Sequence, residues 1–199
     1  MLNITNEDNM ELMARYEDNY FDLAIVDPPY GIGISSDPVR HQHQKKQWDN
    51  EIPQKDYFIE LMRVSKNQII WGGNYFLDYL GNTQGFLIWD KKQPHDFSLA
   101  MCELAWMSFQ TPAKIFRYSV LAEKWKQHPT QKPVKLYEWL LANYAKEGDR
   151  ILDTHLGSGS SAIAAHYGGF DFVGCELDED CYKAACNRFD NETSQIDMF

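Results

Sequence analysis

The four consecutive residues with the clearest chemical potential are Asp27, Pro28, Pro29 and Tyr30. The two prolines fix the backbone and remove two N–H donors, so the Pro28 carbonyl is held outward beside the Asp27 carboxylate. Two acceptors this close can take both hydrogens of one amino group, and Tyr30 offers a flat face for stacking. The pattern favours a site for a planar base that carries an exocyclic amino group and is extruded from its helix. A proline-rich turn with a core tyrosine is the alternative.

A glycine-containing turn at Gly157 and Gly159 is the second candidate site. It follows an expected strand and precedes an expected helix, where glycines let the backbone turn tightly and come close to a ligand. Glu176 ends the next expected strand, where a carboxylate can accept both hydroxyls of a ribose. The turn is neither a phosphate-binding P-loop nor a Gly-x-Gly-x-x-Gly fingerprint. An ordinary strand-to-helix turn, with Glu176 as a first-turn helix acid, is the alternative.

The elements that must position these residues follow from hydrophobic periodicity. Strands are expected at residues 2–5, 22–26, 68–71, 86–89, 103–108, 150–152 and 171–175. Helices are expected at residues 10–16, 57–64, 134–145, 161–167 and 179–189. Strands that alternate with helices predict an α/β fold with a doubly wound, mostly parallel sheet. Ligands of such sheets bind beyond the carboxyl ends of the strands, so both candidate motifs are expected on the same rim.

Three segments, in this order, resemble motifs of the S-adenosylmethionine-dependent DNA methyltransferases that methylate exocyclic amino groups. Asp-Pro-Pro-Tyr at residues 27–30 resembles their catalytic motif, and residues 153–160 resemble their cofactor-binding motif. His-Pro-Thr-Gln-Lys-Pro at residues 128–133 resembles the segment that precedes the cofactor motif in the permuted β-class. The order of the motifs is itself typical of the β-class. The resemblance implies a Rossmann-like, circularly permuted methyltransferase fold.

The resemblance also implies roles for individual residues. It makes Asp27, Pro28, Pro29 and Tyr30 the catalytic residues and S-adenosylmethionine the cofactor. The cofactor-binding residues that it implies are Asp8, Thr130, Lys132, Asp153, Gly157, Gly159 and Glu176. Two positions depart from the family pattern, because Glu7 stands where Gly is usual and His155 replaces an aromatic residue expected near the cofactor. Lys132 has a plain alternative as a solvated residue before a helix whose first position is Pro133.

The activity implied is methylation of adenine N6 in DNA. Relatives that act on cytosine N4 more often have Ser at the position of Asp27, and glutamine-methylating enzymes resemble an Asn-Pro-Pro-Tyr pattern. Cytosine-N4 methylation stays open, as does a catalytically silent DNA-binding module. The chain lacks a Pro-Cys dipeptide, which excludes the usual covalent route to cytosine C5. Because most relatives are longer, a small solitary or phage-type enzyme is expected, with or without a companion restriction enzyme.

A net charge of −10 argues against strong nonspecific DNA binding, which needs Lys and Arg against phosphates. Binding depends on a local patch, however, and basic residues gather in a long, aperiodic loop at residues 31–52. Within it, Arg40, Lys45, Lys46 and Trp48 are the expected DNA-binding residues, although a solvated face would explain the charges equally well. His41 and His43 have no evident third ligand, so no metal is expected.

One domain is expected at residues 1–190, with the DNA-facing loop at 31–52 and a tail at 191–199. The tail resembles the bacterial sliding-clamp-binding pentapeptide. In that interpretation Gln195 makes polar contacts, Ile196 and Met198 enter apolar pockets, and Phe199 anchors the end. Folding of these apolar side chains back onto the domain is the alternative.

The remaining composition points to a packed globular protein, with six Trp, eleven Tyr and eleven Phe. No apolar run approaches the length of a membrane span, and residues 1–4 do not begin a signal peptide. The four cysteines form no Cys-x-x-Cys pair and are expected as reduced thiols. These features favour the cytoplasm of a bacterium or of a phage-infected host, with DNA as partner and no membrane. A homodimer stays open.

Overall fold

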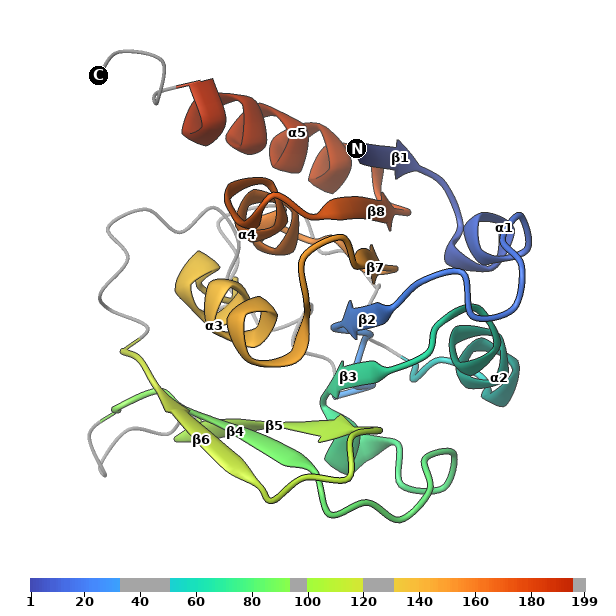
Figure 1. Cartoon of the computed structure of the whole chain (residues 1–199), viewed down its shortest axis with the longest axis vertical. Helices are drawn as coiled ribbons and strands as arrows, with labels where there is room; N and C mark the ends of the chain where they lie inside the picture. Colours follow the sequence, from blue (N-terminus) through green and yellow to red (C-terminus); the bar gives the residue numbers. More distant parts are fainter. Residues whose placement is uncertain (33–50, 94–99, 120–130, 195–199) are drawn as a thin grey trace.

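A computed structural model of the chain describes residues 1–32, 51–93, 100–119 and 131–194 (Figure 1). In this part of the chain the strands are β1 (Leu2–Asn6), β2 (Leu23–Val26), β3 (Gln68–Trp71), β4 (Phe86–Asp90), β5 (Cys102–Met107), β6 (Lys114–Arg117), β7 (Arg150–Asp153) and β8 (Asp171–Glu176). The helices are α1 (Asn9–Met13), α2 (Lys55–Val64), α3 (Val134–Tyr144), α4 (Ser160–Gly168) and α5 (Glu179–Thr193), with a 3₁₀ helix, η2, at Gly73–Tyr75.

The described strands form one sheet with the order β1-β8-β7-β2-β3-β5-β4-β6. Strands β1, β8, β7, β2 and β3 run parallel to one another, whereas β5 is antiparallel to both β3 and β4. Strand β6 then pairs in parallel with β4. The prediction of a mostly parallel α/β sheet is therefore confirmed.

Helices cover both faces of the sheet: α3 and α4 lie on one side, and α1 and α2 on the other (Figure 1). Strand β2 shows why its sequence is apolar throughout. Leu23 and Ile25 pack in the core cluster shared with α3 and α4, while Ala24 and Val26 pack in the cluster shared with α1 and α2. A parallel strand covered on both faces needs a continuous apolar run rather than an alternating one.

Several element ends differ from the sequence expectation. Helix α1 ends at Met13, short of the expected residue 16, and strand β6, which ends at Arg117, was not among the expected strands. Helix α5 continues to Thr193, beyond the expected end at residue 189. An ion pair between Arg188 and Glu192 at 2.7 Å joins successive turns and supports this extension. Residues 191–193, expected in the tail, are therefore helical.

Within the described ranges, every helix is too short or too polar to cross a membrane.

The buried helix faces make a testable claim about stability. Ile163 on α4 is 0% exposed, so Ile163→Ala should lower the free energy of unfolding by about 2–5 kcal/mol through lost burial and a cavity. Ile59 on α2 is 55% exposed, and Ile59→Ala should change that free energy by less than about 0.5 kcal/mol. Urea unfolding of both variants measures the difference. Equal losses would contradict the arrangement of α4.

Candidate functional site

The site lies where three neighbouring parallel strands, β2, β7 and β8, end at one edge of the sheet. Asp27 directly follows β2, and Glu176 is the last residue of β8. A cavity of about 560 Å³ lies at this edge, within the size range of clefts that hold small ligands. Its lining includes Asp27, Lys132, His155, Gly157 and Glu176. The structure thus brings residues of both predicted motifs to one cavity.

Both carboxylate oxygens of Asp27 have partners. Oδ1 accepts a hydrogen bond from the Tyr30 hydroxyl at 2.5 Å, and Oδ2 forms an ion pair with the Lys132 ammonium. Lys132 Nζ also donates to the Tyr30 hydroxyl oxygen at 3.2 Å, so the three polar groups contact one another. The resemblance assigned Lys132 to the methionine end of a cofactor. The structure places its ammonium on the carboxylate that the sequence predicts to be catalytic.

Lys132 has a second anionic partner, Glu103 on β5. Lys132 Nζ lies 3.0 Å from Glu103 Oε2, and Lys91 Nζ lies 2.5 Å from the other oxygen, Oε1. Charges of alternating sign therefore run from Lys91 through Glu103 and Lys132 to Asp27. The Lys132 ammonium also lies 5.3 Å from the centroid of the Trp71 ring, within range of a cation–π interaction.

The two central groups in this row of charges, Glu103 and Lys132, keep their charges although they are buried. Burial lowers the pKa of Lys132, but Asp27 and Glu103 raise it by more, so the net pKa is above the ordinary lysine value. Burial raises the pKa of Glu103, whereas Lys132 and Lys91 lower it, to about 2. Both groups are consequently ionised at neutral pH. A buried ion pair of this kind is costly to break, because removing one partner leaves the other charge uncompensated.

The glycine turn is braced by two carboxylates. Glu176 Oε2 accepts from the Gly157 backbone N–H at 2.9 Å, and Oε1 accepts from the Asp178 N–H at 3.0 Å. Asp153 accepts from the His155 N–H at 3.0 Å and from the Ser161 hydroxyl at 2.5 Å. Burial raises the pKa of Asp153 to about 7, and burial also raises the pKa of Glu176. Asp153 is 1% exposed, so its hydrogen bonds hold the turn from the interior of the protein.

The other residues predicted for the cofactor lie as follows. Asp8 is the N-cap of α1 and accepts from the Met10 N–H at 2.8 Å. Gly159 is the N-cap of α4 with φ +78°, a left-handed conformation that glycine adopts without strain. Thr130 lies outside the described residues. The same holds for the predicted DNA-binding residues Arg40, Lys45, Lys46 and Trp48, and for the tail residues Gln195, Ile196, Met198 and Phe199.

Sequence reasoning missed two contributors to the site. Glu103 was assigned only to a strand, although a charged residue inside the largely apolar Cys102–Met107 run was a usable signal. Tyr57 on α2 was assigned only to an amphipathic helix. Its hydroxyl lies 2.7 Å from the Thr154 hydroxyl and its ring packs edge-on against His155. Burial lowers the pKa of His155 to about 4, so this imidazole faces the cavity in its neutral form.

The Tyr30 ring is held by its neighbours on η2. The Tyr75 ring stacks on it with centroids 5.1 Å apart, and Tyr75 is 43% exposed. Gly72 has φ +69°, and a Cβ added there would lie 2.2 Å from Tyr30 Cε1. Gly72 therefore lets the backbone come close to the ring of Tyr30, whose hydroxyl donates to Asp27.

Gly72→Ala should lower the free energy of unfolding by more than Gly148→Ala does. Both glycines are left-handed, at φ +69° and +87°, which costs a non-glycine residue about 1–2 kcal/mol. A Cβ at Gly148 meets nothing within 4 Å, whereas one at Gly72 must push Tyr30 away from Asp27. The lost hydrogen bond should add about 1–3 kcal/mol. Urea unfolding measures both values, and equal losses would show that Tyr30 does not depend on Gly72.

Comparison with known proteins agrees with this geometry. Residues 70–187, more than half of the chain, match the N6_N4_Mtase family, described as DNA methylase. Over 75 residues, 36% of the chain, the sequence is 41% identical to the type II methyltransferase M2.DpnII of Streptococcus pneumoniae, and the match spans 28% of that enzyme.

Two solved structures share the fold. The M1.HpyAVI–SAM complex has a TM-score of 0.62 and 19% identity, covering 94% of this chain and all of that one. The cytosine-N4-specific PvuII DNA methyltransferase has a TM-score of 0.67 and 12% identity, covering 94% of this chain and 86% of that one. With a family match over more than half of its residues, this chain belongs to the N6_N4 family of DNA methylases.

Proposed function

We propose that the chain transfers a methyl group from S-adenosylmethionine to the exocyclic amino group of a DNA base, and that the base is adenine, methylated at N6. The observation that carries the proposal is that the Asp27 carboxylate and the turn held by Glu176 line the same cavity. The cavity is then lined both by an acceptor for an amino group, Asp27, and by an acceptor for ribose hydroxyls, Glu176. Family membership supports the reaction class.

The residues at the glycine turn fit the cofactor. The Glu176 carboxylate lines the cavity, and each of its oxygens uses one lone pair on a backbone N–H, which leaves capacity for ribose hydroxyls. The neutral His155 ring on the same wall suits contact with an uncharged heterocycle. When bound, S-adenosylmethionine supplies an electrophilic methyl group on a sulfonium. The M1.HpyAVI complex, which shares the fold, contains SAM.

The chemistry at Asp27 is mainly orientation. An adenine amino group is a poor nucleophile because its lone pair is delocalised into the ring. Hydrogen bonds from the amino group to Asp27 and to the Pro28 carbonyl would localise the lone pair and aim it at the methyl group. In the structure described, Asp27 Oδ1 accepts from the Tyr30 hydroxyl, and a second lone pair on this oxygen remains for the target amino group.

Asp27 favours adenine over cytosine, because the relatives that act on cytosine N4 more often carry Ser at that position. The likeness to the cytosine-N4 enzyme PvuII concerns the fold and leaves cytosine N4 as the second candidate. The chain order also supports assignment to the permuted β-class: the strand that carries Asp27 precedes the strand that leads into the glycine turn. A solitary or phage-type enzyme remains part of the same proposal.

DNA is the proposed partner. Contacts by Arg40, Lys45, Lys46 and Trp48, and clamp binding through residues 195–199, remain predictions because these residues lie outside the described ranges.

Cofactor binding can be tested by calorimetry with S-adenosylmethionine. Glu176→Gln should weaken binding roughly 10–100-fold, as expected for the loss of a charged hydrogen-bond acceptor. Glu179→Gln is the matched control, because Glu179 is an exposed acid on α5 that pairs with Lys183 at 2.6 Å. Absence of binding to the wild-type protein, with or without DNA, would reject the proposed cofactor.

Asp27→Ala should abolish methyl transfer and leave the affinity for S-adenosylmethionine nearly unchanged, because Asp27 contacts the nucleophile and not the proposed ribose site. Mass spectrometry of nucleosides from treated DNA distinguishes N6-methyladenine from N4-methylcytosine. If N4-methylcytosine were the only methylated base found, cytosine would replace adenine as the target base. Cofactor or DNA binding without any methylated base would instead favour the catalytically silent module.

A further inference from the structure

We propose that Glu103 is a positioning residue of the methyl-transfer site. Glu103 does not line the cavity; it holds the Lys132 ammonium and through it fixes the orientation of the Asp27 carboxylate. This inference rests on the proposed function. Of the described residues, Asp27 and Lys132 line the cavity, whereas Glu103 and Lys91 do not. Its contact with the site is the Lys132 ammonium, which lies 3.0 Å from Glu103 Oε2.

The topology explains how Glu103 reaches this edge of the sheet. Strand β5 is antiparallel to β3, and its register pairs Ala105 with Trp71, the last residue of β3. The beginning of β5 therefore lies beside the carboxyl ends of the parallel strands, and Glu103 projects from that beginning. Pairing of β5 with β4 places Glu103 opposite Trp89 and brings Lys91, just after β4, within reach.

The Lys132 ammonium donates hydrogen bonds to Asp27 and to the Tyr30 hydroxyl, and it forms an ion pair with Glu103 at 3.0 Å. The Lys132 side chain is only 4% exposed, so water has little access to replace a lost partner. With Glu103 in place, the Lys132 ammonium is attracted by both Glu103 and Asp27, which together fix its position. Without it, Lys132 follows Asp27 alone and no longer sets the direction of that carboxylate.

The orientation of Asp27 matters because its two oxygens have different tasks. Oδ2 is anchored on Lys132, and Oδ1 is the acceptor that the target amino group would use. Rotation of the carboxylate would move Oδ1 away from that amino group. A misplacement of about 1 Å can reduce turnover roughly 100-fold.

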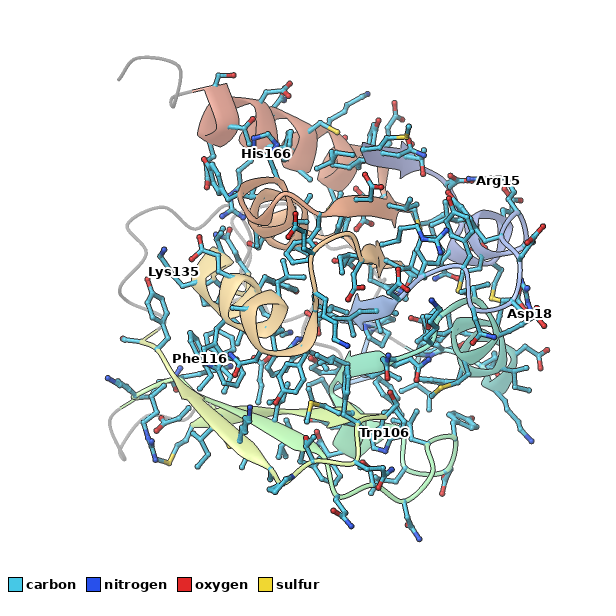
Figure 2. The ribbon with its side chains drawn as sticks, in the orientation of Figure 1. Arg15, Asp18, Trp106, Phe116, Lys135 and His166 are labelled. Atoms are coloured by element: carbon cyan, nitrogen blue, oxygen red, sulfur yellow. The ribbon has the colours of Figure 1, made fainter. Side chains whose placement is uncertain are left out.

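Glu103→Gln keeps the shape and removes the charge. We expect kcat to fall roughly 10–100-fold while the Kd for S-adenosylmethionine stays within about 3-fold of wild type. Glu103→Asp keeps the charge and should recover part of the loss. Glu138→Gln is the matched control, because it removes the same group from a surface pair with Lys135 at 2.7 Å. Lys135 lies on the outer side of α3, away from the sheet (Figure 2).

A double-mutant cycle tests whether Glu103 acts through Lys132. Combined with Lys132→Met, the Glu103→Gln change should cost little further activity, since the group through which it acts is already gone. Additive losses in the double variant would overturn the proposal. Thermal unfolding of each variant checks that the comparison is made between folded proteins.

The titration of Lys132 provides a readout that does not depend on turnover. The groups within electrostatic reach of the Lys132 region are Asp27, Tyr30, Trp71, Lys91, Glu103 and Tyr137. Glu103 raises the pKa of Lys132 against the effect of burial, so its removal should lower that pKa. The alkaline limb of the kcat profile should then move to lower pH in Glu103→Gln, and not in Glu138→Gln.

NMR of protein labelled with ¹³C at lysine Cε, with Lys132→Met to assign the signal, measures this pKa directly. An unchanged Lys132 titration or an unchanged kcat in Glu103→Gln would overturn the positioning role alone. A wild-type protein that binds the cofactor but transfers no methyl group to DNA would overturn the proposed function and the positioning role with it. A lowered pKa together with a lowered kcat is the result that we expect.

Discussion

A buried ammonium must be surrounded by anions, and Lys132 meets this requirement with Asp27 on one side and Glu103 on the other. The same contacts hold the carboxylate at the end of β2 in one place. Burial lowers the pKa of Lys132 and raises that of Glu103, and the neighbouring opposite charges outweigh both effects. The position of the proposed catalytic carboxylate is thus tied to the packing of strands that are far apart in the sequence.

The sheet provides that packing. Parallel strands β2, β7 and β8 bring Asp27 and Glu176 to one edge, and the single change of direction at β5 brings Glu103 to the same edge. Two apolar clusters, one on each face, fix the strands in this register. A site on the ends of rigid strands is held more precisely than one on loops alone, which suits chemistry that depends on orientation.

The sequence predicts the α/β class and most strands, because periodicity is a local property and β3 and β2 are short apolar runs between polar turns. It also predicts that residues 27–30 and 153–160 share a rim, since both follow strand ends. It cannot predict that Lys132 contacts Asp27, because 105 positions separate them and the contact depends on how α3 packs. Glu103 was missed for the same reason: its partners lie on other elements.

The state of Asp27 limits what this site can recognise. Its Oδ1 accepts from Tyr30 and keeps a further lone pair, with which a target amino group would form a hydrogen bond. A base that presents a carbonyl oxygen there would lose the hydrogen bond and face a carboxylate, which is costly in a buried site. Under the proposed function, Asp27 would therefore select amino groups against keto groups. Adenine and cytosine both carry such an amino group, so the hydrogen bond to Asp27 would not by itself distinguish them, and contacts between the cavity walls and the ring would have to add to the preference for adenine that the family resemblance implies.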